Sequence, residues 1–351
     1  MKNLKNNNYN KILVIRLSSM GDIILTSHLV RNLKEHFPDT HIDTIVFSQY
    51  SEIFDNNPYI TKVIKYDKTK NNFEQKLQKK EIFGQDISNP YGLIIDLQKS
   101  RRSKKIYSGV GTECLKIDKN RLFKLALVYL KKKIPNRQKH ITQIYSESVA
   151  PLEIGDDGRG LELWLPEDKL AGFYIPYSTT RQSIASRSRI GIAPGAFHQT
   201  KKWPPEKFIG LANALHNRYG SEIVLLGGGN DTDVCRQIAE NAKCKITDLS
   251  GSQSIYDTVR IIDTCRLVVS NDTGIMHMSA ARHVPVAAIF GSTVPEFGFT
   301  PYRVEHAIIE KIIPCRPCTH YGRAACPKGH FDCMNLIEIN DVLKSAENLL
   351  K

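Results

Sequence analysis

The chain begins with a short apolar run, a turn of small residues and an amphipathic helical pattern, in that order. Residues 11–16 are rich in β-branched side chains and predict a buried strand. Residues 17–22 read Leu-Ser-Ser-Met-Gly-Asp and predict a turn. Apolar residues between 23 and 37 then recur at helical spacing. This order predicts a parallel sheet with crossover helices, which places ligands at the carboxyl ends of its strands.

The same alternation continues through the first half of the chain. The segments that share it are strands at residues 42–47, 62–66 and 91–96, weaker strands at 106–110 and 115–117, and helices at 71–82 and 122–130. We therefore assign residues 1–160 to an N-terminal Rossmann-like domain.

A turn-rich break and an aperiodic Ser, Thr and Arg-rich stretch predict a linker at residues 161–188. Strands and helices alternate again over residues 189–334, which predicts a second Rossmann-like domain that includes the Cys-rich segment 315–333, and residues 335–351 predict a C-terminal helix. The expected fold is α/β: two facing Rossmann-like domains with mainly parallel sheets and an inter-domain cleft.

Charge suggests the kind of partner. The net charge of +13 favours an anionic partner, although a Lys-rich solvated surface is an equally good explanation. Basic clusters lie at residues 99–105, 131–133 and 201–202. None is interleaved with aromatic residues, and no finger or zipper spacing occurs, so we expect no nucleic-acid partner.

The composition also indicates a compartment. The polar residues 1–10 lack the apolar centre of a secretory signal, and no apolar run approaches the ~20 residues of a membrane-spanning helix. We therefore expect a cytoplasmic protein.

The first turn carries one carboxylate, Asp22. A carboxylate at a helix start is stabilised in its ionised form and could act as a base, although an N-capping role is the more common one there. Ser19 and Gly21 belong to the same turn, and Gly21 permits close approach of a ligand.

Two loops in the second half predict an anion site. Lys201 lies in a glycine-containing loop after a strand, where it could neutralise a phosphate or remain a solvated surface lysine. Thr273 and Gly274 begin a helix and offer a hydroxyl and amides to an anion. His277 follows on the same helix and could equally be a buried structural histidine. A third loop, residues 227–233, lacks the dinucleotide fingerprint, which disfavours an oxidoreductase.

Three motifs occur in order: residues 16–22, 194–204 and 270–277. Together they resemble the lipopolysaccharide heptosyltransferases of glycosyltransferase family 9, whose architecture is called GT-B. The resemblance implies transfer of a heptose from ADP-heptose to the inner core of lipopolysaccharide, with inversion and with no cofactor required for the chemistry.

The same resemblance implies that residues 1–160 form the acceptor-side domain and residues 189–334 the nucleotide-sugar-binding domain. It also implies roles for individual residues. Asp22 matches the catalytic base, and Lys201 matches a lysine that contacts the donor phosphates. The donor-binding loop is matched by Asp272, Thr273, Gly274 and His277. The acidic residue that contacts the donor ribose has no clear counterpart in residues 230–233.

Ser19, Gly21, Arg101 and Arg102 are expected on the acceptor side. The basic cluster at 99–105 would meet anionic groups of the lipopolysaccharide acceptor or the inner face of the cytoplasmic membrane, where the enzyme would be peripheral.

Four of the eight cysteines are clustered: Cys315, Cys318, Cys326 and Cys333. This spacing could form a structural zinc or iron site, with His320 and His330 as alternative ligands, or a reduced loop without metal.

Two other functions remain open from the sequence. The chain could use another nucleotide-sugar or acceptor within the same fold, or it could be a non-catalytic basic binding protein. The identity of the nucleotide-sugar that binds distinguishes ADP-heptose transfer from the use of another donor. Nucleic-acid binding that weakens steeply with salt would indicate a non-catalytic basic binding protein.

Overall fold

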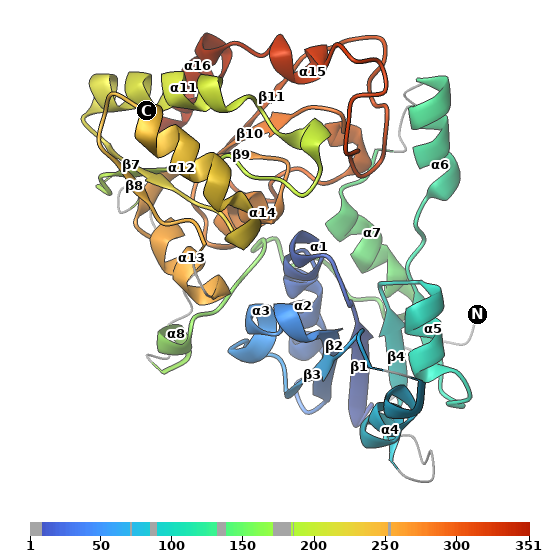
Figure 1. Cartoon of the computed structure of the whole chain (residues 1–351). Coiled ribbons are helices and arrows are strands. Elements are labelled where there is room, and N and C mark those ends of the chain that lie inside the picture. The colour runs from blue at the N-terminus through green and yellow to red at the C-terminus, as the bar shows by residue number, and fades with distance from the viewer. Residues whose placement is uncertain are drawn as a thin grey trace. The chain divides into compact units, whose positions relative to one another are not determined.

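The computed structural model of the chain contains two compact α/β units (Figure 1). The structure describes residues 9–70, 72–84, 90–131, 138–170, 184, 186–251 and 254–351. Unit 1 comprises Met1–Lys119 and Ile141–Phe173, and unit 2 comprises Asn120–His140 and Tyr174–Lys351.

Unit 1 is built on a five-stranded parallel sheet in the order β3-β2-β1-β4-β5. Its strands are β1 (Lys11–Ile15), β2 (His41–Phe47), β3 (Lys62–Tyr66), β4 (Leu93–Asp96) and β5 (Cys114–Lys116). Its helices are α1 (Met20–Ile24), α2 (Ser27–His36), α3 (Glu52–Asp55), α4 (Asn72–Phe83), α5 (Arg101–Tyr107), α7 (Ile141–Ser148) and α8 (Pro166–Leu170), with single turns η1 (Ser48–Tyr50) and η3 (Ala150–Leu152).

The helical pattern after β1 is divided into α1 and α2. The hydroxyl of Thr26 donates a hydrogen bond to the Ile23 carbonyl at 2.7 Å, and the Thr26 amide donates to the same oxygen at 3.0 Å. These bonds tighten the chain between the two helices, because they replace the i to i−4 bonds of a continuous α-helix. The predicted apolar face is retained, since Ile23, Val30 and Leu33 are all buried.

The strand predicted at residues 106–110 is wrong, because α5 extends to Tyr107 and a turn follows it at residues 108–109. The hydroxyl of Ser100 accepts a hydrogen bond from the Ser103 amide at 3.1 Å and so caps the helix. The buried carboxylate of Asp96 accepts from the hydroxyls of Ser103 and Tyr107, at 2.9 and 3.1 Å. Tertiary hydrogen bonds therefore override the local strand preference.

Unit 2 is built on a six-stranded parallel sheet in the order β11-β10-β9-β6-β7-β8. Its strands are β6 (Arg189–Ala193), β7 (Glu222–Leu225), β8 (Ile246–Asp248), β9 (Cys265–Asn271), β10 (Val286–Phe290) and β11 (His306–Glu310). Its helices are α6 (Arg121–Leu125), α11 (Pro205–Tyr219), α12 (Thr232–Asn241), α13 (Ile255–Ile262), α14 (Gly274–Ala281), α15 (Asp332–Asn335) and α16 (Ile339–Leu350), with single turns η2 (Ala126–Leu130), η4 (Gln199–Lys201), η5 (Gly229–Asp231) and η6 (Pro295–Phe297).

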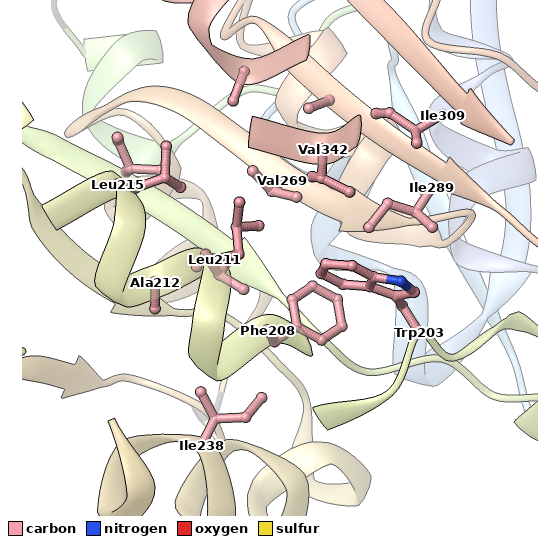
Figure 2. Packing of buried hydrophobic residues seen from close by; sticks show 14 of the residues in the cluster. Trp203, Phe208, Leu211, Ala212, Leu215, Ile238, Val269, Ile289, Ile309 and Val342 are labelled. Atoms are coloured by element: carbon pink, nitrogen blue, oxygen red, sulfur yellow. The ribbon is translucent and has the colours of Figure 1, made fainter. Parts of the chain in front are cut away.

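The core of unit 2 lies between its sheet and the helices α11 and α16. Figure 2 shows the Trp203 and Phe208 rings beside each other, and their centroids are 4.9 Å apart in an edge-to-face arrangement. The Trp203 indole donates to the Ile337 carbonyl at 3.0 Å, which satisfies its one polar atom. Val342 of α16 is fully buried in the same cluster, so the C-terminal helix is an integral part of unit 2.

The unit boundaries differ from the predicted ones at two places. The helix expected in the first domain, at 122–130, belongs to unit 2, because Phe123 and Leu127 pack against Val294 and Phe297. The predicted linker at 161–188 begins inside unit 1, where residues 161–165 are buried. Most of its remainder, residues 171–183 and 185, lies outside the described residues. Among the helices that are described, none is long and apolar enough to cross a membrane.

Arg31 of α2 is fully buried and joins two segments of unit 1. Its guanidinium forms two bonds to the Asp157 carboxylate, at 2.6 and 2.9 Å, and one to Glu162 at 2.8 Å. It also donates to the Gly160 carbonyl at 2.8 Å. Burial raises the pKa of Glu162 above its ordinary value although Arg31 opposes the rise. The Arg31 guanidinium therefore supplies the positive charge that compensates the buried Glu162 carboxylate.

We expect Arg31→Met to lower the free energy of unfolding of unit 1 by about 3–5 kcal/mol, because it leaves the Glu162 carboxylate buried without its cation. Urea unfolding followed by the fluorescence of Trp164, which lies in unit 1, measures the change. Arg236→Met removes an exposed ion pair with Asp233 and should change stability by less than about 1 kcal/mol. Equal midpoints for the two variants would contradict this account.

Candidate functional site

The parallel arrangement brings polar turns to the carboxyl edge of each sheet. In unit 1 the turns after the adjacent strands β1 and β4 share this edge. In unit 2 the loops after the adjacent strands β7, β6, β9 and β10 share the other. All of the predicted catalytic and donor-binding residues lie in these turns and loops or in the helices that follow them.

Asp22 lies in the first turn of α1, directly after β1. Arg16 forms an ion pair with it, with 2.5 Å between the Arg16 Nη2 and Asp22 Oδ1 atoms. The amide and hydroxyl of Ser19 donate to the other carboxylate oxygen, at 3.1 and 2.8 Å. The Asp22 side chain remains 17% exposed, so the carboxylate is held in place and is still accessible.

The charge state of Asp22 follows from these contacts. Burial by itself would raise the pKa of the carboxyl, but the Arg16 charge and the Ser19 hydrogen bonds outweigh it and hold the pKa below its ordinary value. Sequence reasoning expected the helix N-terminus to keep Asp22 ionised. Because α1 has only five residues, the adjacent guanidinium is the stronger cause.

Three residues that support the Asp22 turn were missed by sequence reasoning. The Gln98 side-chain oxygen accepts from the amides of Leu17 and Ser18, at 3.1 and 3.3 Å, and so fastens the turn after β1 to the turn after β4. The Arg16 guanidinium lies 5.7 Å from the ring centroid of Tyr145 and donates to the Leu97 carbonyl. Only Arg16 could have been found from sequence, since it ends the apolar run that leads to Asp22.

The predicted acceptor-side residues lie on the same edge of unit 1. Ser19 is exposed and Gly21 is buried. Arg101 and Arg102 are both exposed in the first turn of α5, and the Arg102 guanidinium is 5.5 Å from the ring centroid of Phe47. The cap of α5 at Ser100 and the Gln98 bridge fix the start of this helix relative to the Asp22 turn.

Lys201 and Asp272 come together in unit 2 from loops that are far apart in sequence. The Lys201 Nζ atom is 2.6 Å from the Asp272 Oδ2 atom, and their side chains are 16% and 9% exposed. Thr293, after β10, donates its hydroxyl to the same carboxylate oxygen at 2.7 Å. The pair therefore joins three strand ends and keeps part of the ammonium group accessible.

Asn271 at the end of β9 is a further residue that sequence reasoning missed. Its side-chain amide donates to the Pro194 carbonyl at 2.8 Å, and its oxygen accepts from the Trp203 amide at 3.2 Å. Both ends of the loop that carries Lys201 are thereby fastened to the strand that precedes Asp272. Asn271 is buried away from water, so these hydrogen bonds to the protein satisfy the polar atoms of its side chain.

Thr273 and Gly274 begin α14 and are partly exposed, as an anion site would require. The Thr273 hydroxyl lies 3.2 Å from that of Ser270. His277 of the same helix is buried, with 4% of its surface exposed, so direct contact with a ligand would require movement.

Asp231, after β7, is packed against the loop that follows β6. A Cβ atom on Gly195 would lie 2.1 Å from the Asp231 carboxyl carbon, so any larger residue there would displace the Asp231 carboxylate. The carboxylate accepts from the Gly228 amide at 3.0 Å, and burial raises its pKa. From the sequence, no carboxylate in residues 230–233 could be chosen as a donor contact. The structure places the Asp231 carboxyl group beside the loop that carries Lys201.

The zinc or iron site suggested by the four clustered cysteines stays a prediction. No group of three or more His, Cys, Asp or Glu side chains among the described residues is arranged to hold a metal ion. Cys333 packs instead with Met334 in the apolar core of unit 2, and burial raises its pKa to about 12. Cys315 lies 3.8 Å from the His330 ring as a sulfur–nitrogen contact.

These arrangements define two kinds of chemistry. The ionised, partly exposed carboxylate of Asp22 can accept a proton from a bound hydroxyl group. In unit 2, the ammonium of Lys201 and the amides that begin α14 can bind an anion.

Comparison with known proteins gives a consistent family. The pattern described as "Glycosyltransferase family 9 (heptosyltransferase)" matches residues 83–328. Lipooligosaccharide heptosyltransferase 2 of Haemophilus ducreyi is 27% identical over 327 residues, which cover 86% of this chain and 89% of that protein.

Two solved structures have the same fold. A family 9 glycosyltransferase of Veillonella parvula has a TM-score of 0.76 and 21% identity and covers 97% of both chains. The structure described as E. coli ADP-heptose lps heptosyltransferase II has a TM-score of 0.69 and 20% identity, and covers 97% of this chain and 98% of that one. They confirm the predicted α/β fold with two mainly parallel sheets.

We expect Arg16→Met to raise the pKa of Asp22, because the variant removes the main favourable charge and leaves burial in place. Carbon-13 NMR titration of the carboxyl, assigned by its loss in Asp22→Asn, measures the shift. Arg102→Met, which removes a cation on α5, should leave the titration unchanged. An unchanged Asp22 pKa in the Arg16 variant would show that the Ser19 hydrogen bonds alone keep the carboxyl ionised.

Proposed function

The chain belongs to glycosyltransferase family 9, and we propose that it transfers a heptose from ADP-heptose to the inner core of lipopolysaccharide, with inversion at the anomeric carbon. The family membership confirms the predicted resemblance. Heptosyltransferases of Haemophilus ducreyi and of E. coli, the latter described with ADP-heptose, support the substrates.

The observation that carries the proposal is the ionised and accessible Asp22 carboxylate in the turn after β1. We assign it the role of general base. An acceptor hydroxyl attacks the anomeric carbon, and its proton passes to Asp22 as the new bond forms. The bond between that carbon and the diphosphate oxygen breaks, and ADP leaves with the electron pair. A single displacement from the face opposite the diphosphate inverts the configuration.

The low pKa of Asp22 has a cost and a benefit. A weak base removes a proton only late in the reaction, when the attacking hydroxyl has become acidic. In return, the free carboxylate is ionised across the physiological pH range, and the proton that it accepts in one turnover is readily released to water before the next. Ser19 and Arg16 also fix its orientation, which lowers the reorganisation needed in the transition state.

We assign the donor diphosphate to the loops of unit 2. The Lys201 ammonium and the amides that begin α14 at Thr273 and Gly274 would offset the charge that develops on the leaving group. Asp272 positions Lys201 through their ion pair, and His277 supports α14 from its buried side. The Lys201 ammonium would thus stabilise the negative charge of the departing diphosphate.

The acceptor is assigned to unit 1. Exposed Arg101 and Arg102 would contact anionic groups of the lipopolysaccharide core, and Ser19 and Gly21 would line the approach to Asp22. A lipid-linked acceptor places the enzyme at the cytoplasmic face of the inner membrane, as a peripheral protein.

Titration calorimetry and transfer kinetics test the two halves of the assignment separately. Asp22→Asn should bind ADP-heptose as the unaltered protein does but lose about 10²–10⁴ in kcat, because only the proton acceptor is removed. Lys201→Ala should weaken donor binding by roughly tenfold or more, because a charge-assisted contact to phosphate is lost.

The calorimetric titrations also include UDP- and GDP-sugars. Selective binding of one of these would identify it as the donor in place of ADP-heptose, with the same mechanism. Binding of nucleic acid that falls steeply with salt, without binding of any nucleotide-sugar, would overturn the enzyme assignment in favour of a basic binding protein. Full turnover by Asp22→Asn would exclude Asp22 as the base.

We expect the double variant Arg101→Glu with Arg102→Glu to raise the acceptor KM by roughly tenfold, because two favourable charges become repulsive. Its affinity for ADP-heptose should not change. Arg218→Glu with Arg236→Glu, two exposed arginines of unit 2, produces the same change in net charge and is the matched control. An equal rise in both double variants would indicate a general charge effect and contradict the assigned acceptor site.

A further inference from the structure

The helical segment formed by α6 and η2 exposes four large apolar side chains. Leu122 is 82% exposed, Leu125 51%, Tyr129 75% and Leu130 65%. The first three are spaced by three and four residues, so they follow one side of the helix. We call these four residues the outer face.

The opposite side of the same segment is packed. Phe123 and Leu127 are buried against Val294 and Phe297 of unit 2. At the end of the segment, Lys131 donates to the carbonyls of Cys315 and Pro317 in the loop that leads to α15 (Figure 1). The inner contacts anchor the segment, so the outer face is presented by a fixed element.

The charged residues of the segment that carries the outer face are all basic. Residues 119–131 contain the basic residues Lys119, Arg121, Lys124 and Lys131 and no Asp or Glu. Arg121 is exposed next to Leu122, and Lys131 follows Leu130. Apolar side chains flanked by basic ones are typical of helices that lie in the interface of an anionic membrane.

We propose that the outer face docks on an anionic lipid bilayer. The leucines would enter the boundary between headgroups and acyl chains, and Tyr129 would place its ring there with its hydroxyl toward water. Arg121 would contact lipid phosphates. This surface is distinct from the basic cluster at 99–105, and the proposal stands apart from the donor chemistry because docking requires no nucleotide-sugar.

Charge disfavours the other simple occupant, a second copy of the chain. A symmetric contact through the outer face would bring two acid-free basic segments together, and like charges directly opposed are repulsive. An anionic bilayer instead complements the segment.

Co-sedimentation with vesicles tests the proposal on the full chain. The unaltered protein should bind vesicles of phosphatidylglycerol and phosphatidylcholine, and bind at least about tenfold more weakly to phosphatidylcholine alone or at high salt. Leu125→Gln should weaken binding to the anionic vesicles by about fivefold, because it removes one inserted side chain. Leu336→Gln, at a leucine of unit 2 that is 48% exposed, should have no effect.

A second pair of variants separates local charge from total charge. Arg121→Glu should weaken vesicle binding by about fivefold or more, whereas Arg236→Glu on α12 makes the same change in net charge and should leave binding nearly unaltered. Equal losses in the two variants would show general electrostatic attraction and overturn the proposal. Loss of a dimer in the Leu125 variant, without vesicle binding in the unaltered protein, would assign the outer face to self-association.

A spectroscopic readout detects insertion itself. The emission of Tyr129→Trp should shift to the blue with anionic vesicles and be quenched by brominated lipid, because the ring enters the apolar boundary. Leu336→Trp should show neither change. Binding without a shift at position 129 would place the contact elsewhere and refute docking by the outer face. None of these measurements depends on transfer activity, so the proposed function can fail while docking is confirmed.

Discussion

Parallel pairing of the strands is the constraint on which the rest of the structure depends. Every described strand pair in both sheets is parallel, so each connection must cross back over a face of the sheet before the next strand begins. All turns that leave the carboxyl ends then meet at one edge per sheet. Asp22 and Gln98 share such an edge, as do Lys201, Asp272 and Thr293, although long stretches of chain separate them.

Sequence reasoning succeeded where the information is local. The short β-branched runs at β1, β2 and β9 are buried on both faces, so their composition alone identifies them. The glycine-containing turns next to these strands identified the Asp22 turn and the α14 start, because turn chemistry depends on adjacent residues. The alternation of strand and helix segments along the sequence was likewise sufficient to predict an α/β fold.

It failed where a contact depends on the tertiary arrangement. The Gln98 bridge and the Tyr145 ring come to Arg16 and its turn from more than 80 residues away, and nothing local marks either of them. The 106–110 segment looked like a strand because the Asp96 bonds that stabilise α5 are not visible in composition.

Because residues 120–140 belong to unit 2, the gene cannot be divided into two halves that match the two units. The polypeptide crosses between the units after Lys119, again after His140 and a third time after Phe173. A recombinant N-terminal fragment ending near residue 160 would carry Phe123 and Leu127 without their partners, and a C-terminal fragment would leave Val294 and Phe297 uncovered. Chimaeras between paralogues would need their junctions at all three crossings, with the helix of one parent kept beside its own binding surface.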